Sequence, residues 1–312
     1  MRLILTGAGS FTGFWFARAL AEAGHEVIAP LRGALDGEGR RGRRLAMLAD
    51  RVRLVPHAPF GSEAFAALIA EAGPLDVLCH HGAQVGDYRS PSFDPFAAAE
   101  ANLHRPAQTL EALAAAGCRR MVLTGSVFEA DEGAGSHPMR AFSAYGLSKT
   151  LTGAAAAYYA GQAGVRLDKF VIPNPFGPHE EPRFTDYLMR TWLGGAAAEC
   201  RTPLYVRDNV PVSLLALAYA DFVGDAGASP APRRLNPSFY PESQGAFALR
   251  VSREVAERLG RPCPIALGRQ TAFDEPAVRI NTDLLDPARL GWDEAAAWDA
   301  FVGYYRGVYG CQ

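Results

Sequence analysis

The sequence predicts an α/β fold built on a parallel sheet, and three observations support this. Strand-like apolar runs alternate with helix-like segments through the first half of the 312-residue chain. The first strand leads directly into a glycine-rich turn and a helix. The composition, 49% hydrophobic and 21% charged, is typical of a globular protein with a sizeable core. Strands that alternate with helices of this length form βαβ units, which build parallel sheets.

The expected strands are short apolar runs, as is usual for parallel strands buried on both faces. They cover residues 3–5, 26–31, 52–57, 75–83, 119–126 and 166–174. The expected helices start at Phe14 and then cover residues 64–73, 96–117 and 144–164. After residue 173 the sequence is rich in proline and polar residues, and its segments are shorter and less regular. This part is expected to cap the sheet.

Charge and cysteine content argue against several functions. The formal net charge is −2, so no global basic field indicates nucleic acid. The five cysteines have no paired spacing, which argues against a zinc site or disulfide framework and favours a reducing compartment. No run of about 18 apolar residues indicates a membrane span, and the first residues do not resemble a signal peptide. We expect a soluble, cytoplasmic protein with no metal, nucleic-acid partner or membrane partner.

The glycine-rich turn is a candidate phosphate site. Residues 6–13 read TGAGSFTG, with Gly7, Gly9 and Gly13. Glycines let the backbone approach a phosphate, and the free N–H groups and dipole of the following helix favour an anion. Taken alone, the segment is equally consistent with an ordinary strand-to-helix turn.

A second candidate site combines three polar residues. Tyr145 and Lys149 are four residues apart, so they share one face of the expected helix. An ammonium beside a phenol lowers the pKa of the phenol from about 10 toward neutrality, which suits proton transfer near pH 7. Ser126 ends the preceding strand, where open parallel sheets bind ligands, and its hydroxyl is suited to hold the same substrate oxygen. Taken alone, Tyr145 and Lys149 are equally consistent with ordinary surface residues, and Ser126 with a helix or turn cap.

In this order, the motifs resemble the extended short-chain dehydrogenase/reductase family of nucleotide-sugar epimerases, dehydratases and ketoreductases. The family patterns T-G-x-x-G-x-x-G and D-x-V-x-H-x-A-A have counterparts at residues 6–13 and 76–83. Asn102 matches a helix asparagine of the family. Its N-x-x-G-P loop, R-D-x-x-x-V strand and C-terminal L-G-W resemble residues 173–178, 205–212 and 290–292. The resemblance covers nearly the full length of the chain.

The resemblance implies a Rossmann-type doubly wound parallel sheet with a smaller C-terminal substrate-binding lobe. The NAD(P)-binding domain would cover residues 1–173, with a contribution from about 205–238, and the lobe mainly residues 174–312. The cofactor would contact Gly7, Gly9, Ser10, Phe11, Gly13, Arg32, His80, Gly82, Ala83, Asn102, Tyr145, Lys149 and Pro173.

The resemblance also implies catalytic and substrate-binding roles. Tyr145 would be the acid/base, Lys149 would bind the nicotinamide ribose and tune Tyr145, and Ser126 would orient the sugar oxygen. The nucleotide sugar would contact Ser126, Asn174, His179 and Arg207, with Arg207 near its diphosphate. The fork geometry of arginine suits phosphate oxygens.

Two departures from the family pattern concern the cofactor. Ser10 stands where the second glycine of the fingerprint belongs. The second strand ends in APLR, without the acid that NAD enzymes use to bind the ribose hydroxyls. The following Arg32 suits a 2′-phosphate, so NADP(H) is favoured, with NAD as the alternative. The alternative interpretation of Arg32 is a solvated arginine on a loop.

The segment SVFE at residues 126–129 separates subclasses of the family. Sugar 4,6-dehydratases place Asp-Glu directly after the strand-end hydroxyl residue, whereas Val127 and Phe128 cannot move a proton. Glu129 comes one position later, and on an extended backbone it would point to a different side. Dehydration by this route is therefore not expected.

The favoured function is an NADP(H)-dependent keto-sugar reductase acting on a nucleotide sugar. Besides Arg32, His179 adds some support: a GDP-fucose synthase, an NADPH enzyme of the family, has a similar Gly-Pro-His stretch, and a histidine can serve as a second acid. A loop histidine bonded to the backbone is the equally good alternative interpretation of His179. One alternative is a nucleotide-sugar 4-epimerase with tightly held NAD(P). Another is a non-catalytic NADP-sensing or scaffold protein. Family members often dimerise through helices of the sheet domain, so a homodimer is a candidate assembly.

Overall fold

The computed structural model describes residues 1–35, 38–87, 90, 92–225 and 231–310. The chain forms two compact units. The N-terminal unit comprises Met1–Glu132, Arg140–Ile172 and Tyr219–Asn236. The C-terminal unit comprises Gly133–Met139, Pro173–Ala218 and Pro237–Gln312.

The N-terminal unit is built on a seven-stranded parallel sheet with the order β11-β7-β5-β4-β1-β2-β3. Its strands are β1 (Arg2–Thr6), β2 (Glu26–Pro30), β3 (Arg53–Val55), β4 (Val77–His80), β5 (Arg120–Ser126), β7 (Arg166–Ile172) and β11 (Arg234–Leu235). The order reverses between β1 and β4, and open α/β sheets bind ligands at the carboxyl ends of strands beside such a reversal. The predicted α/β class and doubly wound parallel sheet are confirmed.

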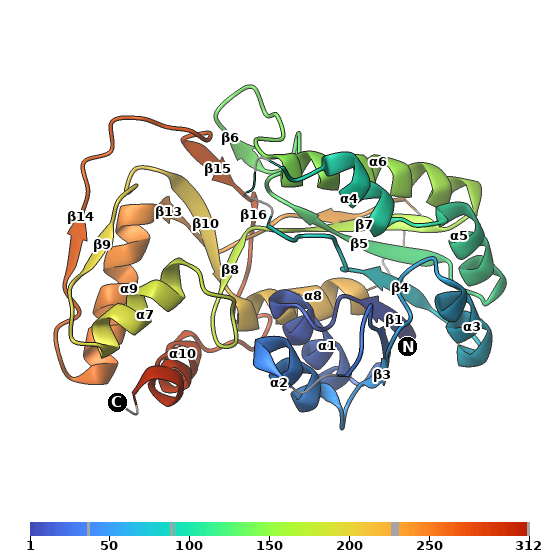
Figure 1. Ribbon diagram of the computed structural model, residues 1–312, viewed down its shortest axis with the longest axis horizontal. Helices are drawn as coiled ribbons and strands as arrows, with labels where there is room; N and C mark the ends of the chain where they lie inside the picture. Colours follow the sequence, from blue (N-terminus) through green and yellow to red (C-terminus); the bar gives the residue numbers. More distant parts are fainter. Residues whose placement is uncertain (36–37, 88–89, 91, 226–230, 311–312) are drawn as a thin grey trace. The chain divides into compact units, whose positions relative to one another are not determined.

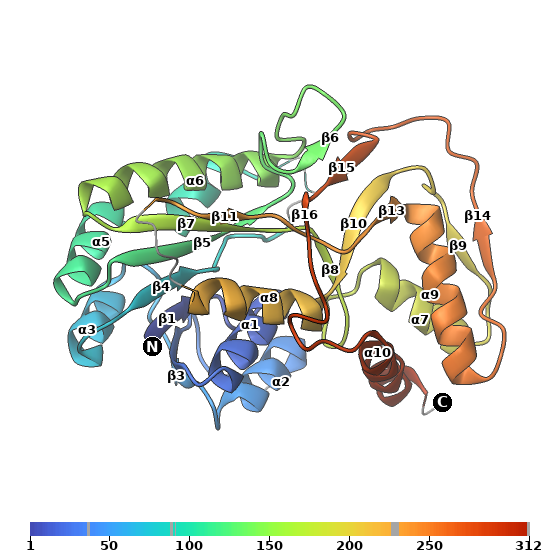
Figure 2. The same ribbon diagram turned by 180° about the vertical axis from the view of Figure 1, so that it is seen from behind.

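Helices cover both faces of this sheet (Figure 1). One face carries α3 (Glu63–Ala72), α4 (Pro95–Asn102), α5 (Pro106–Ala115) and α6 (Ala144–Gln162). The other carries α1 (Phe11–Glu22), α2 (Gly39–Leu48) and the end of α8 (Val212–Gly224), as the reverse view in Figure 2 also shows. On the first face Phe65, Leu110 and Met121 belong to one buried cluster. On the second, Phe16 stacks on Tyr219 with ring centroids 3.9 Å apart.

The structure corrects two expectations about helices. The predicted helix at 96–117 is two helices, because Pro106 lacks a backbone N–H and disfavours helical backbone at the residue before it. Arg105 accordingly adopts a φ of +46° between α4 and α5. The arginine-rich run near residues 40–44, for which no helix was predicted, forms α2, where Leu45 and Leu48 supply the buried face.

The C-terminal unit contains a mixed sheet with the order β13-β10-β15-β6, and β8 pairs with β10. Its strands are β6 (Ala134–Gly135), β8 (Asn174–Phe176), β10 (Val206–Pro211), β13 (Tyr240–Ser243) and β15 (Val278–Ile280). Two further pairs join β9 (Ala198–Cys200) to β14 (Ile265–Leu267) and β12 (Pro237–Ser238) to β16 (Asp283–Leu284). Helices α7 (Phe184–Leu193), α9 (Gln244–Leu259) and α10 (Glu294–Tyr309) contribute to an aromatic core that includes Trp192, Phe247 and Phe301.

The division into units differs in detail from the expected domains. Apart from residues 133–139, the chain stays in the N-terminal unit up to Ile172 and changes unit at Pro173, beside the expected boundary at 173. The segment that returns to the N-terminal unit is Tyr219–Asn236, which is shorter than the expected 205–238 because β10 pairs with β8, β13 and β15 in the other unit. Residues 133–139 belong to the C-terminal unit because β6 pairs with β15.

Candidate active site

The turn between β1 and α1 is shaped by glycines that leave no room for a side chain. Gly7 has a φ of +81°, and a Cβ there would lie 2.8 Å from the Cα of Gly82. A Cβ on Gly13 would lie 2.1 Å from the carbonyl oxygen of Gly7. The strand, the turn and the N-terminus of α1 therefore form a backbone cradle of the kind that binds phosphate groups.

Ser10 also has a structural role in this turn. It is the N-cap of α1: its Oγ accepts a hydrogen bond from the Gly13 N–H at 3.1 Å and donates one to the Gly7 carbonyl at 2.9 Å. A hydroxyl at this position satisfies one of the free N–H groups of a helix N-terminus. The helix therefore starts at the buried Phe11, and the predicted start at Phe14 was wrong.

His81 is part of this turn, although it was not a predicted site residue. Its Nε2 lies 3.1 Å from the Ser10 Oγ and 3.0 Å from the Thr12 Oγ1. Its ring packs edge-on against Phe16. Burial lowers the pKa of His81 to about 3, so the ring is neutral at ordinary pH. His81 thus links the end of β4 to the first turn of α1.

The predicted residues His80, Gly82 and Asn102 belong to one hydrogen-bonded network. The His80 ring lies 3.1 Å from the Thr6 Oγ1 and 2.9 Å from the Asn102 carbonyl oxygen. The Gly82 N–H donates to the Thr6 Oγ1, and the Asn102 Oδ1 accepts from the Gln84 N–H. Burial lowers the pKa of His80 to about 4. The network fixes the segment after β4, which includes the predicted Ala83.

Ser126 and the two predicted helix residues come from neighbouring elements, β5 and α6. Ser126 is the last residue of β5, and its Oγ accepts a hydrogen bond from the Phe128 N–H at 3.2 Å. Gly146 lets α6 approach this turn, since a Cβ there would lie 2.2 Å from the Phe128 carbonyl oxygen. Close packing of α6 therefore brings Tyr145 and Lys149 to the end of β5.

Lys149 is a buried cation, 4% exposed, and its Nζ donates to the Thr124 carbonyl of β5 at 2.6 Å. Burial lowers the pKa of Lys149, and the Glu129 carboxylate opposes this effect. Tyr145 lies one helical turn earlier, with its ring edge-on to Phe128 at 6.4 Å between centroids. The phenol and the ammonium therefore occupy one face of α6.

The backbone after Ser126 forms a turn, which corrects the extended conformation assumed for Glu129. The Glu129 N–H donates to the Ser126 carbonyl at 3.0 Å. Its carboxylate accepts from the Ser126 N–H at 2.7 Å and pairs with Lys169 at 2.5 Å. Val127 and Phe128 are apolar, so neither supplies the proton-transfer groups of a dehydratase.

Three arginines lie near the carboxyl ends of β1, β2 and β4. Arg44 of α2 is buried and donates to the Gly9 carbonyl at 3.1 Å. Arg41 lies against the same residue, because a Cβ on Gly9 would be 3.3 Å from its Nε. Arg32 donates to the Gln84 side chain at 2.5 Å. Arg32 was a predicted site residue, whereas Arg41 and Arg44 were not, because α2 was not predicted.

The C-terminal unit contains the other predicted residues. Asn174 starts β8 and pairs in register with Asn209 of β10, and the buried Pro173 precedes it. His179 has a φ of +69°, and its ring packs on Tyr304 of α10 with centroids 4.5 Å apart. The substrate roles of Asn174 and His179, and the cofactor role of Pro173, stay predictions.

Arg207 is buried within the C-terminal unit. Its guanidinium donates to the Pro276 carbonyl at 3.0 Å and pairs with Glu275 at 2.9 Å. Its register partner across the parallel pair β10–β15 is Arg279, which is fully buried. Two arginines thus stand side by side, and Arg279 was not a predicted site residue. The contact of Arg207 with a diphosphate stays a prediction, and it requires the guanidinium to rearrange from Glu275.

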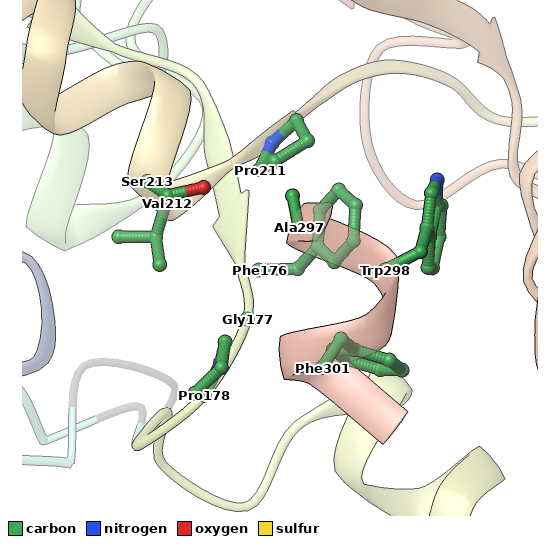
Figure 3. A pocket seen from close by; sticks show the side chains of 9 residues that line it. All are labelled: Phe176, Gly177, Pro178, Pro211, Val212, Ser213, Ala297, Trp298 and Phe301. Atoms are coloured by element: carbon green, nitrogen blue, oxygen red, sulfur yellow. The ribbon is translucent and has the colours of Figure 1, made fainter. Parts of the chain in front are cut away.

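A small pocket in the C-terminal unit is lined by residues of β8, the start of α8 and α10 (Figure 3). Phe176, Trp298 and Phe301 supply aromatic surface, and Val212 and Ser213 face them from α8. The lining includes one side-chain hydroxyl and no ionisable group. The pocket therefore offers apolar packing and no proton-transfer group.

Among the described residues, no three His, Cys, Asp or Glu side chains are grouped as a metal site requires. Nor is any helix in that part of the chain long and apolar enough to cross a membrane. The described cysteines are buried free thiols, at Cys79, Cys118, Cys200 and Cys263.

A family model described as NAD dependent epimerase/dehydratase matches residues 3–224. Among curated proteins, none matches significantly. A UDP-glucuronic acid 4-epimerase from Bacillus cereus, solved with UDP-glucuronic acid and NAD, has a similar structure, with 14% identity over 99% of this chain and 100% of that chain and a TM-score of 0.71.

Two more solved structures are similar over 99% of this chain. A UDP-glucose 4-epimerase from Thermotoga maritima, with UDP-glucose, has 18% identity over 99% of its own length and a TM-score of 0.69. A dTDP-glucose 4,6-dehydratase from Streptomyces venezuelae, with NAD bound, has 21% identity over 98% of its length and a TM-score of 0.68. At these identities the similarity shows a shared fold.

Proposed function

This chain belongs to the NAD-dependent epimerase/dehydratase family, which makes it an enzyme of the extended short-chain dehydrogenase/reductase type, and we propose that it is a nucleotide-sugar 4-epimerase. The observation that carries the proposal is the arrangement of Ser126, Tyr145 and Lys149 where α6 packs on β5. These groups suffice for reversible oxidation of a sugar hydroxyl. Val127 and Phe128 lack the acid and base that removal of water needs.

The residues around the glycine-rich turn fit a nicotinamide dinucleotide. A side chain at Gly7 or Gly13 would collide with the backbone of Gly82 or Gly7, so the tight turn requires glycine there. The N-terminus of α1 favours the charge of a pyrophosphate. The turn from Gly7 to Gly13 would hold the pyrophosphate, and Tyr145 with Lys149 would hold the nicotinamide ribose. When bound, such a cofactor would supply reversible hydride transfer at the sugar carbon.

The side chains at the end of β5 handle the proton. As the C4 hydroxyl becomes a carbonyl, its O–H bond breaks and Tyr145 takes the proton. The Lys149 ammonium favours the phenolate that receives it, and the Ser126 hydroxyl donates a hydrogen bond to the same sugar oxygen. When the carbonyl is reduced on its other face, Tyr145 returns the proton. The two half-reactions balance, and no cofactor is consumed.

Adjacent cations in the C-terminal unit support a nucleoside diphosphate as the carrier of the sugar. Arg207 and Arg279 are register partners, and both are almost completely buried. Arg207 pairs with Glu275, whose side chain is half exposed, so a diphosphate would have to replace this carboxylate. The fork geometry of arginine matches phosphate oxygens. Two solved relatives hold UDP-sugars, so UDP-sugars are the first compounds to test.

The proposal can be tested by incubating the protein with pairs of 4-epimeric UDP-sugars and NAD⁺ or NADP⁺, and by following both sugars by NMR. The expected result is interconversion of one pair with no net change in cofactor absorbance. A 4-keto-6-deoxy product from any parent sugar would contradict the proposal. Matched reactions with Tyr145→Phe show whether conversion depends on this active site.

A keto-sugar reductase is the second candidate function, and the arginines near the turn favour it. No acid ends β2, and Arg32, Arg41 and Arg44 lie around the strand ends where a cofactor ribose binds in this fold. This arrangement supports a preference for NADP(H), the cofactor of reductive steps. Net oxidation of NADPH by a 4-keto sugar nucleotide would favour this function over epimerisation.

We propose the NADP(H) preference for either function. Arg32→Glu is expected to weaken NADP⁺ binding at least about tenfold, because it replaces a cation that favours the 2′-phosphate by an anion that repels it. NAD⁺ binding should change much less. Arg53→Glu, an exposed arginine on β3, is the control for a general change of charge. Equal affinities of the wild-type protein for the two cofactors would contradict the preference.

We also propose that the protein is a homodimer formed through α4 and α6. These helices pack on one another and present large apolar side chains to solvent, namely Phe96, Leu147 and Tyr158. Large apolar side chains exposed on two packed helices favour a protein–protein contact there.

A further inference from the structure

The turn after β5 places the carboxylate of Glu129 against the backbone of Ser126, the last residue of the strand. Glu129 holds both backbone groups of Ser126: its Oε1 accepts from the Ser126 N–H at 2.7 Å, and its N–H donates to the Ser126 carbonyl at 3.0 Å. The glutamate is 1% exposed. The direction of the Ser126 hydroxyl therefore depends on the conformation of one acidic residue outside the predicted site.

Lys169 of β7 binds the other oxygen of this carboxylate. The Lys169 Nζ lies 2.5 Å from the Glu129 Oε2 and 2.6 Å from the Glu132 Oε1. Arg234 in turn lies 3.3 Å from the Glu132 Oε2. The carboxylates of Glu129 and Glu132 are buried, and each pairs with a cation. Pairing offsets the free-energy cost of burying their charges.

The ion pair is enclosed between β5 and α6. A Cβ on Gly125 would lie 2.6 Å from the Lys169 Cε, so a larger residue there would displace the end of the lysine side chain. A Cβ on Gly153 would lie 3.5 Å from the Lys169 Nζ and 3.7 Å from the Glu129 Oε2. Gly153 is one turn beyond Lys149 on α6. The ion pair therefore lies beneath the helix that carries the candidate catalytic residues.

The two lysines of this region, Lys149 and Lys169, are the only lysines among the 31 Lys and Arg residues of the sequence. A lysine ammonium is a compact point charge whose pKa responds to its surroundings, unlike a guanidinium. The chain thus has lysine only at the buried Lys149 and at Lys169, whose side chain is 15% exposed. This distribution also makes lysine a selective spectroscopic probe of the site.

The charges around Lys149 come from three elements besides its own helix. Burial lowers its pKa, Glu129 of the turn after β5 raises it, and Lys169 of β7 lowers it. His80 and His81 follow from β4, and burial keeps both neutral. Glu129 is therefore the anion that favours a protonated Lys149.

We propose that Glu129, held by its ion pair with Lys169, is a positioning residue that fixes the Ser126 strand end and sets the charge beside Lys149. The proposal rests on the proposed roles of Ser126 and Lys149 in the reaction. Glu129 does not contact the reacting atoms. It acts by orienting the hydroxyl of Ser126 and by keeping Lys149 in the ammonium form that the Tyr145 phenolate needs.

The test is a pH titration of both lysines by NMR in the full-length protein labelled with [ε-¹³C]lysine. Lys169→Met identifies the Lys149 signal. Glu129→Gln keeps an amide oxygen for the Ser126 N–H but removes the charge, so it is expected to lower the midpoint of Lys149 by about one pH unit or more. Glu129→Gln/Lys169→Met removes both opposing charges and is expected to return the midpoint toward that of the wild type. This titration needs no substrate, so its outcome is independent of the proposed function.

Glu132→Gln is the matched control: in the described part of the chain, Glu132 shares Lys169 with Glu129 but makes no hydrogen bond to Ser126. It is expected to leave the Lys149 midpoint close to that of the wild type. In turnover, Glu129→Gln should lower kcat at least about tenfold and move the alkaline limb of the pH profile to lower pH, with KM little changed. An unchanged Lys149 midpoint in Glu129→Gln, or an equal shift in Glu132→Gln, would overturn the proposal. Circular dichroism identifies any variant that fails to fold. If Glu129→Gln does not fold, the Lys149 midpoint is compared between Lys169→Met and Glu129→Gln/Lys169→Met.

Discussion

At the scale of single residues, the proposed chemistry depends on the hydroxyl of Tyr145. Tyr145→Phe is expected to lower kcat by about 10² to 10⁴, the usual effect of losing a general acid or base. Cofactor affinity should stay near that of the wild type, because the ring and Lys149 remain. Turnover and cofactor titration are the measurements. Tyr158→Phe, on the exposed face of the same helix, is the control, and near-normal turnover in Tyr145→Phe would remove this residue from its role.

Glu180 gives the C-terminal unit a stability that depends on pH. It is fully buried, and burial raises the pKa of its carboxyl to about 7. Its Oε1 accepts hydrogen bonds from the hydroxyls of Thr185 and Tyr305. An acid with a higher pKa in the folded state takes up a proton on folding. Stability is therefore highest below its ordinary pKa and falls as pH rises toward 7.

Thermal melts between pH 4 and pH 8 check this prediction. The melting temperature of the wild type is expected to fall as pH rises through this window, and Glu180→Gln should remove part of that fall because its side chain stays neutral. The neighbouring Glu181, which is only partly buried, supplies the control Glu181→Gln. Equal pH dependence in wild type and Glu180→Gln would contradict the role assigned to Glu180.

Single residues could be predicted from sequence where the signal is local. The positions of Ser126 at a strand end and of Tyr145 and Lys149 on one helix were predicted because these signals are visible within one segment. The catalytic roles of these residues stay predictions. His81 was missed because its partner Ser10 is 71 residues away. Arg279 was missed because its register partner Arg207 lies on another strand. Such contacts depend on which elements become neighbours, and no short pattern contains that information.

At the scale of elements, side chains from two segments hold the first turn of α1. Ser10 caps the helix, and His81 of the segment after β4 contacts the Ser10 and Thr12 hydroxyls. Ser10→Ala and His81→Leu are each expected to weaken cofactor binding several-fold, because the turn loses a constraint near the proposed pyrophosphate. The double variant should weaken cofactor affinity by a smaller factor than the product of the two single factors, as expected for residues in contact.

Cofactor titration of the two single variants and the double variant measures this coupling. Ser62→Ala is the control, because Ser62 caps α3 with the same geometry, a hydrogen bond of 3.1 Å from the Phe65 N–H. It should lower stability by about 1 kcal/mol, the usual cost of losing a cap, without changing cofactor affinity. Independent effects of Ser10→Ala and His81→Leu would show that the contact does not shape the cofactor site.

The elements themselves were predictable where one periodicity dominates. Each predicted strand of the N-terminal unit is present, because short apolar runs between turns favour buried strands. The first strand is longer than predicted, at Arg2–Thr6, and the others are shorter. Helix α2 was not predicted because four of its ten residues are arginines, which gives no clear apolar periodicity. Only Leu45 and Leu48 are large apolar residues on its buried face. The break before Pro106 was missed although proline gives a local signal, since the alanine-rich segments on both sides suit a helix.

At the scale of the whole molecule, the family was predicted from six short motifs in register and is confirmed by the match over residues 3–224. The reductase function favoured by sequence has less support than its epimerase alternative, because a missing acid and Arg32 concern the cofactor and not the reaction. The sequence did not show which segments belong to the N-terminal unit and which to the C-terminal unit. The seven residues Gly133–Met139 belong to the C-terminal unit through β6–β15 pairing, which joins positions more than 140 residues apart.

The proposed dimer yields the prediction for the whole molecule. Phe96 and Tyr158 are 69% and 63% exposed on α4 and α6, so an isolated subunit would leave two aromatic side chains in water. The wild type is expected to sediment as a dimer at micromolar concentration. Phe96→Glu/Tyr158→Glu should sediment as a folded monomer that still binds cofactor, because charges in an apolar interface are not compensated. Phe273→Glu, at an exposed aromatic position of the C-terminal unit, should leave the dimer intact. A monomeric wild type, or a dimer unaffected by the α4 and α6 substitutions, would show that this face is not the interface.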